Sequence, residues 1–402
     1  MMRVLVINSG SSSIKFRLYE MAQEELLAAG TLERIGADNG CHDYQIYSPS
    51  GDMERHEGRS VIADHRAGLK EVFAFLEKNN LVNSAASLYA IGHRVVHGGE
   101  TFQEPTLIDD RVLEEIHSMV PLAPLHNPAN LVGIEAMRES CPQVPQVAVF
   151  DTAFFRTLPP HAYRYALGDT FYQDHQVRRY GFHGTSHQYV AQQAAHFLQQ
   201  PLAALRLITL HLGNGASAAA IRDGVCIDTS MGMTPLEGLI MGTRCGDLDP
   251  AVHFYLARTL GMDFDEIEHL LNNDSGMKGL CGVSDMRDVH RLADEGNEQA
   301  RLALAMYCYR IVKYIGAYYL ALGGLDALVF TGGVGENDAL IRQSVCAGIG
   351  VLGISIDAQL NHAGASGTFS ISEADKKVGV LVVPTNEELE IARQSVTLLK
   401  KM

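Results

Sequence analysis

Arginine, histidine and aspartate side chains follow apolar runs in the first half of the chain, where they could bind an anion. The stretch "IGHRVVHGGE" places His93, Arg94 and His97 at the end of an apolar strand, and Asp151 directly follows the run "VAVF". Arginine stays charged and binds carboxylate or phosphate in a bidentate geometry. A carboxylate at the end of a buried strand is either paired or placed to act on a ligand. These residues therefore indicate chemistry on an anion.

Further candidates for this chemistry lie at three other points of the chain. They are His126 in "PLAPLHNPA", Arg178, Arg179, His183 and His187 in "RRYGFHGTSH", and Arg244, Asp247 and Asp249 in "MGTRCGDLDP". A lone histidine beside a strand is more often a satisfied core group, and Asp249 is interpreted as a helix N-cap worth about 1 kcal/mol. We interpret His187, one turn into the helix that follows Thr185 and Ser186, as structural too. The i, i+4 spacing of His183 and His187 leaves a zinc site open, although no H-E-x-x-H motif is present.

Three glycine-rich junctions follow apolar runs. The run Val4–Ile7 leads into Asn8, Gly10, four serines and Lys15, and residues 207–224 repeat this plan with Gly213 in the place of Gly10. The third junction is "VFTGGVGEN". Glycines let backbone N–H groups approach phosphate oxygens closely. No single junction matches a P-loop, but together they predict two related domains that enclose a phosphate-rich ligand.

Uninterrupted apolar runs indicate the elements that position these residues. The runs Val4–Ile7, Leu207–Leu210, Leu328–Phe330 and Val378–Val383 are typical of strands buried on both faces, which favours an α/β fold with helices covering the sheets. Helix starts are expected at Asn127 as N-cap before Pro128, and at Thr385 in a capping box with Glu388. Glu387 then either interacts with the helix dipole or binds magnesium.

Composition argues against several classes of protein. The length of 402 residues fits two domains, and a net charge of -15 opposes non-specific binding to nucleic acid or anionic membranes. The seven scattered cysteines favour neither disulfides nor a thiolate zinc site, and the N-terminus lacks a signal-peptide pattern, so we expect a cytoplasmic protein. The most apolar stretch, Tyr314–Phe330, is divided by Gly323, Gly324 and Asp326 and is interpreted as helix, turn and strand.

The motifs together resemble those of the acetate kinases, within the superfamily of acetate and sugar kinases, heat-shock chaperone ATPases and actin. Ten motifs occur in the family's order: "NSGSSSIKF", "GHRVVHGGE", "PLAPLHNPANL", "VAVFDTAF", "RRYGFHGTSH", "HLGNGAS", "DTSMGMTPLEGL", "GTRCGDLDP", "FTGGVGEN" and "PTNEE". The resemblance spans essentially the whole chain.

The resemblance implies a duplicated actin-like (ribonuclease H-like) α/β fold with the active site in the cleft between two domains. The N-terminal domain would comprise residues 1–152 and 386–402, and the nucleotide-binding C-terminal domain residues 153–385. The implied reaction is reversible in-line phosphoryl transfer from ATP to acetate, giving acetyl phosphate and ADP, with Mg2+ or in its place Mn2+. A homodimer is implied as well.

The resemblance also assigns roles to residues. Asn8 and Glu387 would hold the metal. The catalytic set would be Arg94, His126, Asp151, His183 and Arg244, and the acid would contact Arg94, Val96, Leu125, Phe182 and Pro235. The nucleotide would contact Ser11, Ser12, Lys15, His211, Leu212, Gly213, Asn214, Gly215, Asp285, Met286, Arg287, Gly332, Gly333, Val334, Gly335 and Glu336. Because acetate is already an anion, we expect Asp151 to orient charged groups rather than act as a general base.

Two departures and two alternatives accompany this interpretation. Cys245 stands where the family usually has serine, and "GVSDMRD" is one residue shorter than the family's version, which bears on the contacts near Asp285.

A propionate or butyrate kinase is the nearest alternative. Val96 favours the smaller acid, although a pocket discriminates between acids that differ by one methylene by only about 10–200-fold. An ATP-switched binding protein of the actin or chaperone type is the alternative from another class.

Overall fold

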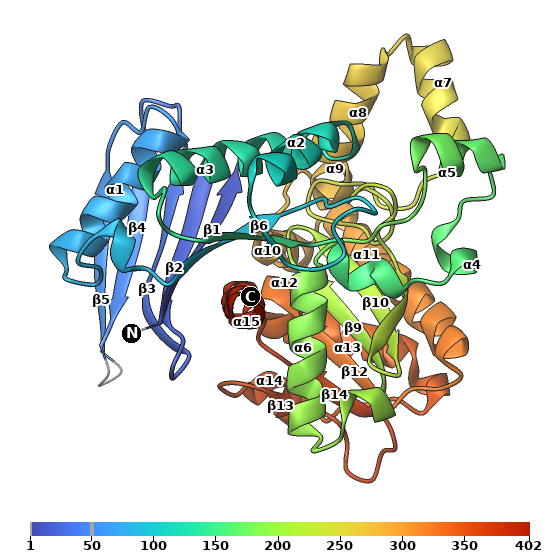
Figure 1. Ribbon diagram of the computed structural model, residues 1–402. Helices are drawn as coiled ribbons and strands as arrows, with labels where there is room; N and C mark the ends of the chain where they lie inside the picture. The colour runs from blue at the N-terminus through green and yellow to red at the C-terminus, as the bar shows by residue number, and fades with distance from the viewer. Residues whose placement is uncertain (1, 49–51) are drawn as a thin grey trace. The chain divides into compact units, whose positions relative to one another are not determined.

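The computed structural model describes residues 2–48 and 52–402, which form two compact units. Unit 1 consists of Met1–Ala153 and Asn386–Met402, apart from the residues not described, and unit 2 consists of Phe154–Thr385. Each unit contains one β-sheet covered by helices (Figure 1). The expected α/β class is therefore confirmed.

The sheet of unit 1 has eight strands in the order β5-β4-β3-β2-β1-β6-β8-β7. Its strands are β1 (Arg3–Gly10), β2 (Ser13–Glu20), β3 (Glu25–Glu33), β4 (Cys41–Tyr47), β5 (Met53–Arg59), β6 (Ala90–Val95), β7 (Thr106–Leu107) and β8 (Gln146–Phe150). Strands β1, β6 and β8 are parallel, and the others pair antiparallel. The carboxyl ends of β1, β6 and β8 thus lie at one edge, where ligands of parallel sheets bind.

Helices cover both faces of this sheet because its central strands are apolar on both sides. The helices are α1 (His65–Lys78), α2 (Asp110–Ser118), α3 (Asn127–Ser140) and α15 (Glu387–Lys401). Leu5 and Ile7 of β1 belong to a core that includes residues of α1 and α3. A Cβ at Gly92 would meet Ile391 of α15 at 2.7 Å, so the absence of a side chain there lets α15 pack closely on β6.

The sheet of unit 2 has six strands in the order β11-β10-β9-β12-β14-β13. They are β9 (Arg206–Leu212), β10 (Ala216–Arg222), β11 (Val225–Thr229), β12 (Ala327–Thr331), β13 (Phe369–Ser370) and β14 (Gly379–Val382). The helices are α4 (Pro160–Tyr163), α5 (Asp169–His175), α6 (Gly184–Phe197), α7 (Ala251–Leu260), α8 (Phe264–Asn273), α9 (Gly276–Cys281), α10 (Met286–Asp294), α11 (Glu298–Leu322), α12 (Gly332–Asn337), α13 (Ala339–Gly348) and α14 (Ala358–Ala363). Helix α6 packs on β9 and β12, and α11 packs on β9 and β10.

The two sheets repeat one plan, as the sequence repeat predicts. The six strands of unit 2 follow the same order and directions as β3-β2-β1-β6-β8-β7 of unit 1, which has β4 and β5 in addition. Even the registers correspond: the parallel pairing begins at Val4 with Ala90 in unit 1, and at Leu207 with Ala327 in unit 2. The duplicated fold is thus confirmed from the pairing of the strands.

The structure corrects two local predictions, on the loop after β1 and on the N-caps of helices, and confirms a third. Ser11 and Ser12 are the two turn residues of a tight hairpin between paired Gly10 and Ser13, rather than part of a longer loop. Helix α3 is preceded by His126 and α15 by Asn386, so neither Asn127 nor Thr385 is an N-cap. Asp249 is not an N-cap either, because Pro250 holds that position before α7. The stretch from Tyr314 to Phe330 is the end of α11, a turn and most of β12, as expected. In the described residues, no helix is both long and apolar enough for a membrane span.

Candidate active site

In unit 1, Arg94 and Asp151 form a bidentate ion pair at the carboxyl edge of the sheet. Arg94 lies on β6 and Asp151 directly follows β8; Nε donates to Oδ1 at 3.1 Å and Nη2 to Oδ2 at 2.6 Å. The backbone N–H of Asp151 donates to the carbonyl of Val95 at 3.0 Å, which fixes the start of the loop. Burial alone would lower the pKa of Arg94, but the charges of Asp151 and Glu387 raise it, so the guanidinium stays charged. Both predicted residues are thus brought together.

Glu387 is the third charged group of this edge, and its chemistry fits a metal site. Its carboxylate lies 3.8 Å from Arg94 Nε. Burial, with a smaller effect of Asp151 and Glu388, raises its pKa to about 7 against the opposing effect of Arg94 and Lys15. A carboxylate in this setting ionises fully when a cation lies beside it. No group of three or more His, Cys, Asp or Glu in the described part of the chain could hold a metal, but Mg2+ is usually bound by one or two carboxylates with water and phosphate.

Asn8 and Lys15 lie opposite each other in the hairpin that β1 and β2 form. They are paired residues of β1 and β2, with the turn residues Ser11 and Ser12 just beyond. Asn8 is partly buried, whereas Lys15, Ser11 and Ser12 are exposed. Because Lys15 acts electrostatically on Glu387, the hairpin and the start of α15 belong to one charged region. The residues present therefore suit a magnesium ion held by Asn8 and Glu387.

Two asparagines of α3 hold the ends of β1 and β6 in place. Asn127 accepts from the backbone N–H of His97 and donates to its carbonyl, both at 3.1 Å. Asn130 accepts from the N–H of Val96 at 3.1 Å and donates to the carbonyl of Ser9 at 2.8 Å. Both asparagines are buried. The expected substrate residue Val96 is thus positioned by side chains whose role the sequence analysis missed.

The remaining predicted residues of unit 1 lie just before α3. His126 is partly buried and immediately precedes the first residue of the helix, and Leu125 is 50% exposed. An apolar side chain with this exposure is available to cover a small ligand.

In unit 2, the side chains of His183 and Arg244 both approach Gly215. A Cβ at Gly215 would lie 3.3 Å from Nε2 of His183 and 3.6 Å from Nη1 of Arg244, so the missing side chain leaves room between two donors. The ring of His183 stacks on that of His211 with centroids 4.3 Å apart. Nη1 of Arg244 donates to the carbonyl of Pro235 at 3.2 Å, and Phe182 is buried next to His183 in the chain. Two donors at one point are suited to phosphoryl oxygens.

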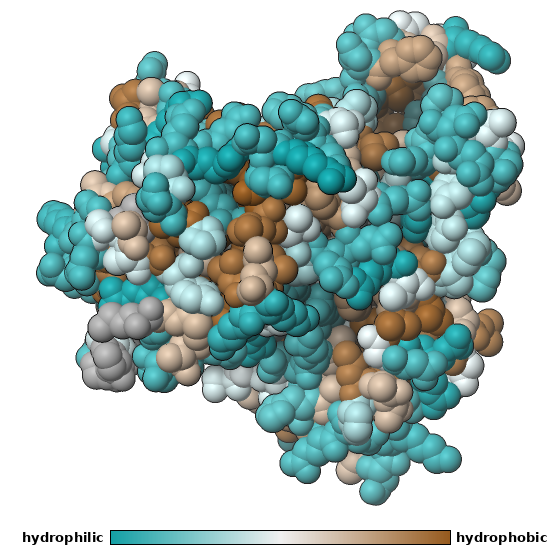
Figure 2. Space-filling view, in the orientation of Figure 1, coloured by the Kyte–Doolittle hydropathy of each residue, from teal (hydrophilic) through white to brown (hydrophobic). Residues whose placement is uncertain are grey.

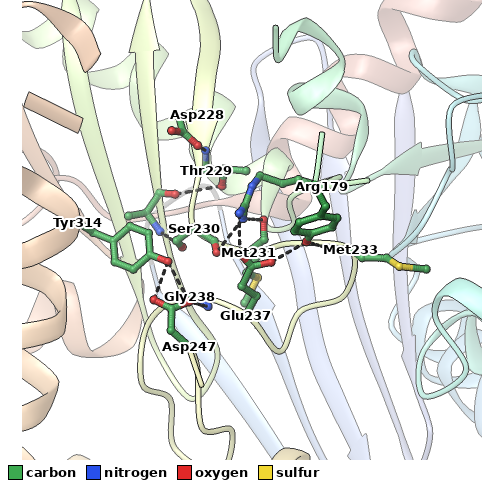
Figure 3. Close-up of polar contacts among 12 residues, drawn as sticks. Arg179, Asp228, Thr229, Ser230, Met231, Met233, Glu237, Gly238, Asp247 and Tyr314 are labelled. Atoms are coloured by element: carbon green, nitrogen blue, oxygen red, sulfur yellow. Dashed lines mark hydrogen bonds and ion pairs between the residues drawn. The ribbon is translucent and has the colours of Figure 1, made fainter. Parts of the chain in front are cut away.

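A partly buried polar network supports the loop that carries Pro235 and Arg244 (Figure 3). Arg179 donates to Glu237 Oε1 at 2.5 Å and to the carbonyl of Met231 at 2.9 Å. Asp247 accepts from the N–H of Gly238 at 2.9 Å and from the hydroxyl of Tyr314, which lies 2.9 and 3.1 Å from its two carboxylate oxygens. Residues 231–247 are therefore anchored near both ends of the loop.

A cavity of about 900 Å³ in unit 2 gathers seven of the sixteen expected nucleotide contacts. Its walls include Gly213, Asn214, Asp285, Met286, Arg287, Gly333 and Val334. The segment Asp285–Arg287 is the start of α10, where Asp285 is the N-cap and accepts from the N–H of Arg287 at 2.9 Å. A cavity of this size is typical for a small organic ligand.

The other expected nucleotide residues of unit 2, Gly215 among them, do not line the cavity. Leu212 is fully buried, and a Cβ at Gly332 would meet the Leu212 carbonyl at 2.8 Å, so only glycine fits where the two loops cross. Glu336 accepts from the N–H of Gly332 at 2.9 Å and from that of Thr385 at 3.0 Å. Glu336 thus braces the loop. His211 and Gly335 likewise do not line the cavity.

The cavity also has walls that sequence reasoning did not identify. They include Met277, Ser284, His290, Tyr307, Asn337, Asp338, Leu340 and His362. His290 and Asp338 form a pair with Nε2 and Oδ2 2.7 Å apart. Asn337 and Asp338 directly follow the "GGVGE" loop, and this adjacency was the available signal. His290, Tyr307 and His362 come from separate helices and have no signal in the sequence.

Comparisons with known proteins agree along the whole chain. The model of the acetokinase family matches residues 3–393. An acetate kinase of Syntrophobacter fumaroxidans is 51% identical over 401 residues, covering 100% of this chain and 98% of that protein. The crystal structure of Porphyromonas gingivalis acetate kinase superposes with a TM-score of 0.91 at 44% identity, covering 99% and 100% of the two chains. A propionate kinase from Francisella tularensis gives 0.92 at 41% identity, covering 98% and 99%.

The fold and these similarities establish the class of the protein before they establish its family. Two repeated α/β units, with close structural likeness to kinases along the full length, are the duplicated fold of the actin-like ATPases. Within that class, the chain belongs to the acetokinase family.

Proposed function

We propose that this protein is an acetate kinase, which transfers the γ-phosphoryl group of ATP to acetate and catalyses the reverse reaction. The observation that carries this proposal is 51% identity, over essentially the whole chain, to a curated acetate kinase. The ion pair of Arg94 and Asp151 in unit 1 and the donors beside Gly215 in unit 2 support the same reaction. We further propose that units 1 and 2 are the two domains.

Arg94 binds the carboxylate of acetate in this proposal. Its Nε and Nη2 are oriented by Asp151, and the guanidinium has further N–H groups that can donate to an anion. We assign the contacts with the methyl group to Val96, Leu125, Phe182 and Pro235. Because the nucleophile is already an anion, holding it in line is the main requirement, and Asp151 serves by orienting Arg94.

His183 and Arg244 stabilise the phosphoryl group during transfer. Arg244 is permanently charged and His183 directs Nε2 to the space beside Gly215, so both can donate to equatorial oxygens. We propose that His126, which immediately precedes α3, also belongs to the catalytic set. The nucleotide occupies the cavity bounded by Gly213, Asp285 and Gly333. We also assign Ser11, Ser12 and Lys15 to contacts with the nucleotide.

Asn8 and Glu387 are the residues that would hold Mg2+, with Mn2+ as a substitute. The raised pKa of Glu387 supports this assignment, since a nearby cation restores the charged form. The ion would neutralise charge on the phosphates. A cytoplasmic location stays a prediction from the sequence.

A hydroxamate-trapping assay with MgATP tests the function. Acetate, propionate and butyrate are offered separately to purified protein, and acyl phosphate is trapped as the hydroxamate. The largest kcat/KM is expected with acetate. A preference for propionate would favour the second candidate, which the likeness to the Francisella tularensis enzyme supports. Failure to form product from any of the acids would contradict the proposal and favour an ATP-switched binding protein.

A further inference from the structure

A chain of three buried hydrogen bonds leads from His183 into the core of unit 2. Nδ1 of His183 lies 2.9 Å from Oγ of Ser217, and Nε2 of His187 lies 2.8 Å from the same oxygen. Nδ1 of His187 lies 2.7 Å from Oγ1 of Thr209. Ser217, His187 and Thr209 have no exposed surface. The chain connects an imidazole at the proposed phosphoryl site with a threonine in the middle of β9.

The hydrogens along this chain are coupled. Ser217 has one hydroxyl hydrogen, and in the described part of the chain its side-chain hydroxyl bonds to these two imidazoles alone. Accepting from both rings would leave that hydrogen buried without an acceptor, so Ser217 donates to one ring and accepts from the other. In the first direction Thr209 donates to His187, His187 donates through Nε2 to Ser217, and Ser217 donates to Nδ1 of His183. In the second direction Nδ1 of His183 donates to Ser217 and every later hydrogen is reversed.

Thr209 selects the first direction. Within residues 2–48 and 52–402, the hydroxyl of Thr209 has one hydrogen-bond partner, Nδ1 of His187, and it is shielded from water. The second direction would leave this hydroxyl hydrogen buried without an acceptor, which is unfavourable. Burial, with a smaller effect of His211, also lowers the pKa of His187 well below its ordinary value. His187 is therefore neutral and carries one ring hydrogen.

We propose that Thr209, His187 and Ser217 are positioning residues, which hold neutral His183 in the tautomer that carries its hydrogen on Nε2. This nitrogen is on the side of the ring that faces Gly215, beside Arg244. An Nε2–H group there donates to a phosphoryl oxygen, whereas an Nε2 lone pair would repel it. The consequence for catalysis rests on the proposed function, but the tautomer itself does not.

The first experiment determines the tautomer directly. Protein labelled with 15N-histidine is studied by NMR at alkaline pH without substrates, and the His183 signals are assigned by their loss in His183→Gln. We expect the hydrogen on Nε2 in the wild-type protein and a mixture of tautomers in Thr209→Val. A hydrogen on Nδ1 in the wild-type protein would overturn the proposal, and so would an unchanged tautomer in Thr209→Val. The wild-type measurement is informative even if Thr209→Val does not fold or no acid is phosphorylated.

The second experiment compares kinetics. Thr209→Val removes the hydroxyl and should lower kcat about five- to tenfold, as expected for one lost hydrogen bond, with each KM within about twofold. Thr209→Ser keeps the hydroxyl and should restore kcat. Thr229→Val is the matched control, because Thr229 is equally buried in unit 2 but donates to the carbonyl of Ala218 at 3.0 Å. Equal losses in Thr209→Val and Thr209→Ser, or in Thr229→Val, would contradict a role of the hydrogen-bond chain.

Discussion

Asp151 is buried and shares both of its oxygens with Arg94, which argues for an orienting role at the scale of single residues. A carboxylate held in this way fixes the direction of the guanidinium, and misplacement of a substrate-binding group can cost about 10²-fold in rate. We therefore expect Asp151→Asn to lower kcat/KM for acetate by about 10²-fold, without changing the shape of its pH profile.

Steady-state kinetics across neutral pH measures this effect. Asp110→Asn is the control, because Asp110 pairs with Arg138 at 2.8 Å on the surface of the same unit. Retention of most activity in Asp151→Asn would remove any essential role of Asp151. The loss of a pH-dependent limb would instead identify it as a base.

His93 predicts how the stability of unit 1 depends on pH. It is buried on β6 with Nε2 2.8 Å from Oε1 of Gln146, and burial lowers its pKa from 6.5 to about 4. Between these values the unfolded chain binds a proton that the folded chain does not, so the free energy of unfolding falls as pH falls. The stabilisation is complete above pH 6.5 and is lost as the pH approaches 4.

Urea unfolding of the wild-type protein and of His93→Gln tests this dependence. The difference between their unfolding free energies should change by about 2 kcal/mol between pH 7 and pH 5, since one pKa unit corresponds to about 1.4 kcal/mol. His117→Gln is the control because His117 is 59% exposed on α2. Parallel pH curves for the wild-type protein and His93→Gln would refute the assignment.

At the scale of elements, the sequence predicted features that depend on local signals. Apolar runs marked the strands β1, β9, β12 and β14, and the repeat around Gly10 and Gly213 gave the duplicated plan. Residues that act through tertiary contacts were missed. Asn127 has the chemistry of an N-cap, but its side chain bonds to His97 instead. His187 is interpreted from the sequence as a structural residue one turn into a helix, and the sequence gives no sign of its link to His183. That link passes through Ser217, 30 residues further along the chain.

The loop between Met231 and Asp247 depends on α11 for its position (Figure 3). Tyr314 of α11 donates to Asp247, which in turn accepts from the N–H of Gly238. Tyr314→Phe should therefore lower the stability of unit 2 by about 1–2 kcal/mol, as for a hydrogen bond to a charged group. It should also speed amide hydrogen exchange in residues 231–247 and lower kcat through Arg244. Tyr309→Phe is the control, because Tyr309 is on the same helix and 66% exposed. Unchanged exchange in this loop would exclude the proposed support.

At the scale of the whole molecule, α7 predicts association of two copies of the chain. None of its ten residues is buried, and Phe254, Tyr255 and Leu260 are 57%, 60% and 61% exposed in the single chain. Figure 2 shows apolar surface at the upper right, where Figure 1 places α7 and α8. A helix of this length is marginal in water without packing, and large exposed apolar surface is typical of an interface. The homodimer expected from the family resemblance would cover this face.

Sedimentation velocity tests the dimer. The wild-type protein should sediment with twice the chain mass of 43.8 kDa, and Phe254→Asp should shift it to the monomer by placing a charge in the apolar face. Val351→Asp is the matched control, because Val351 is 95% exposed in a 3₁₀ turn of the same unit and outside α7. A wild-type monomer at micromolar concentration would contradict the homodimer. A dimer that survives Phe254→Asp would place the interface elsewhere, because a buried unpaired carboxylate at the centre of an apolar contact would not be tolerated.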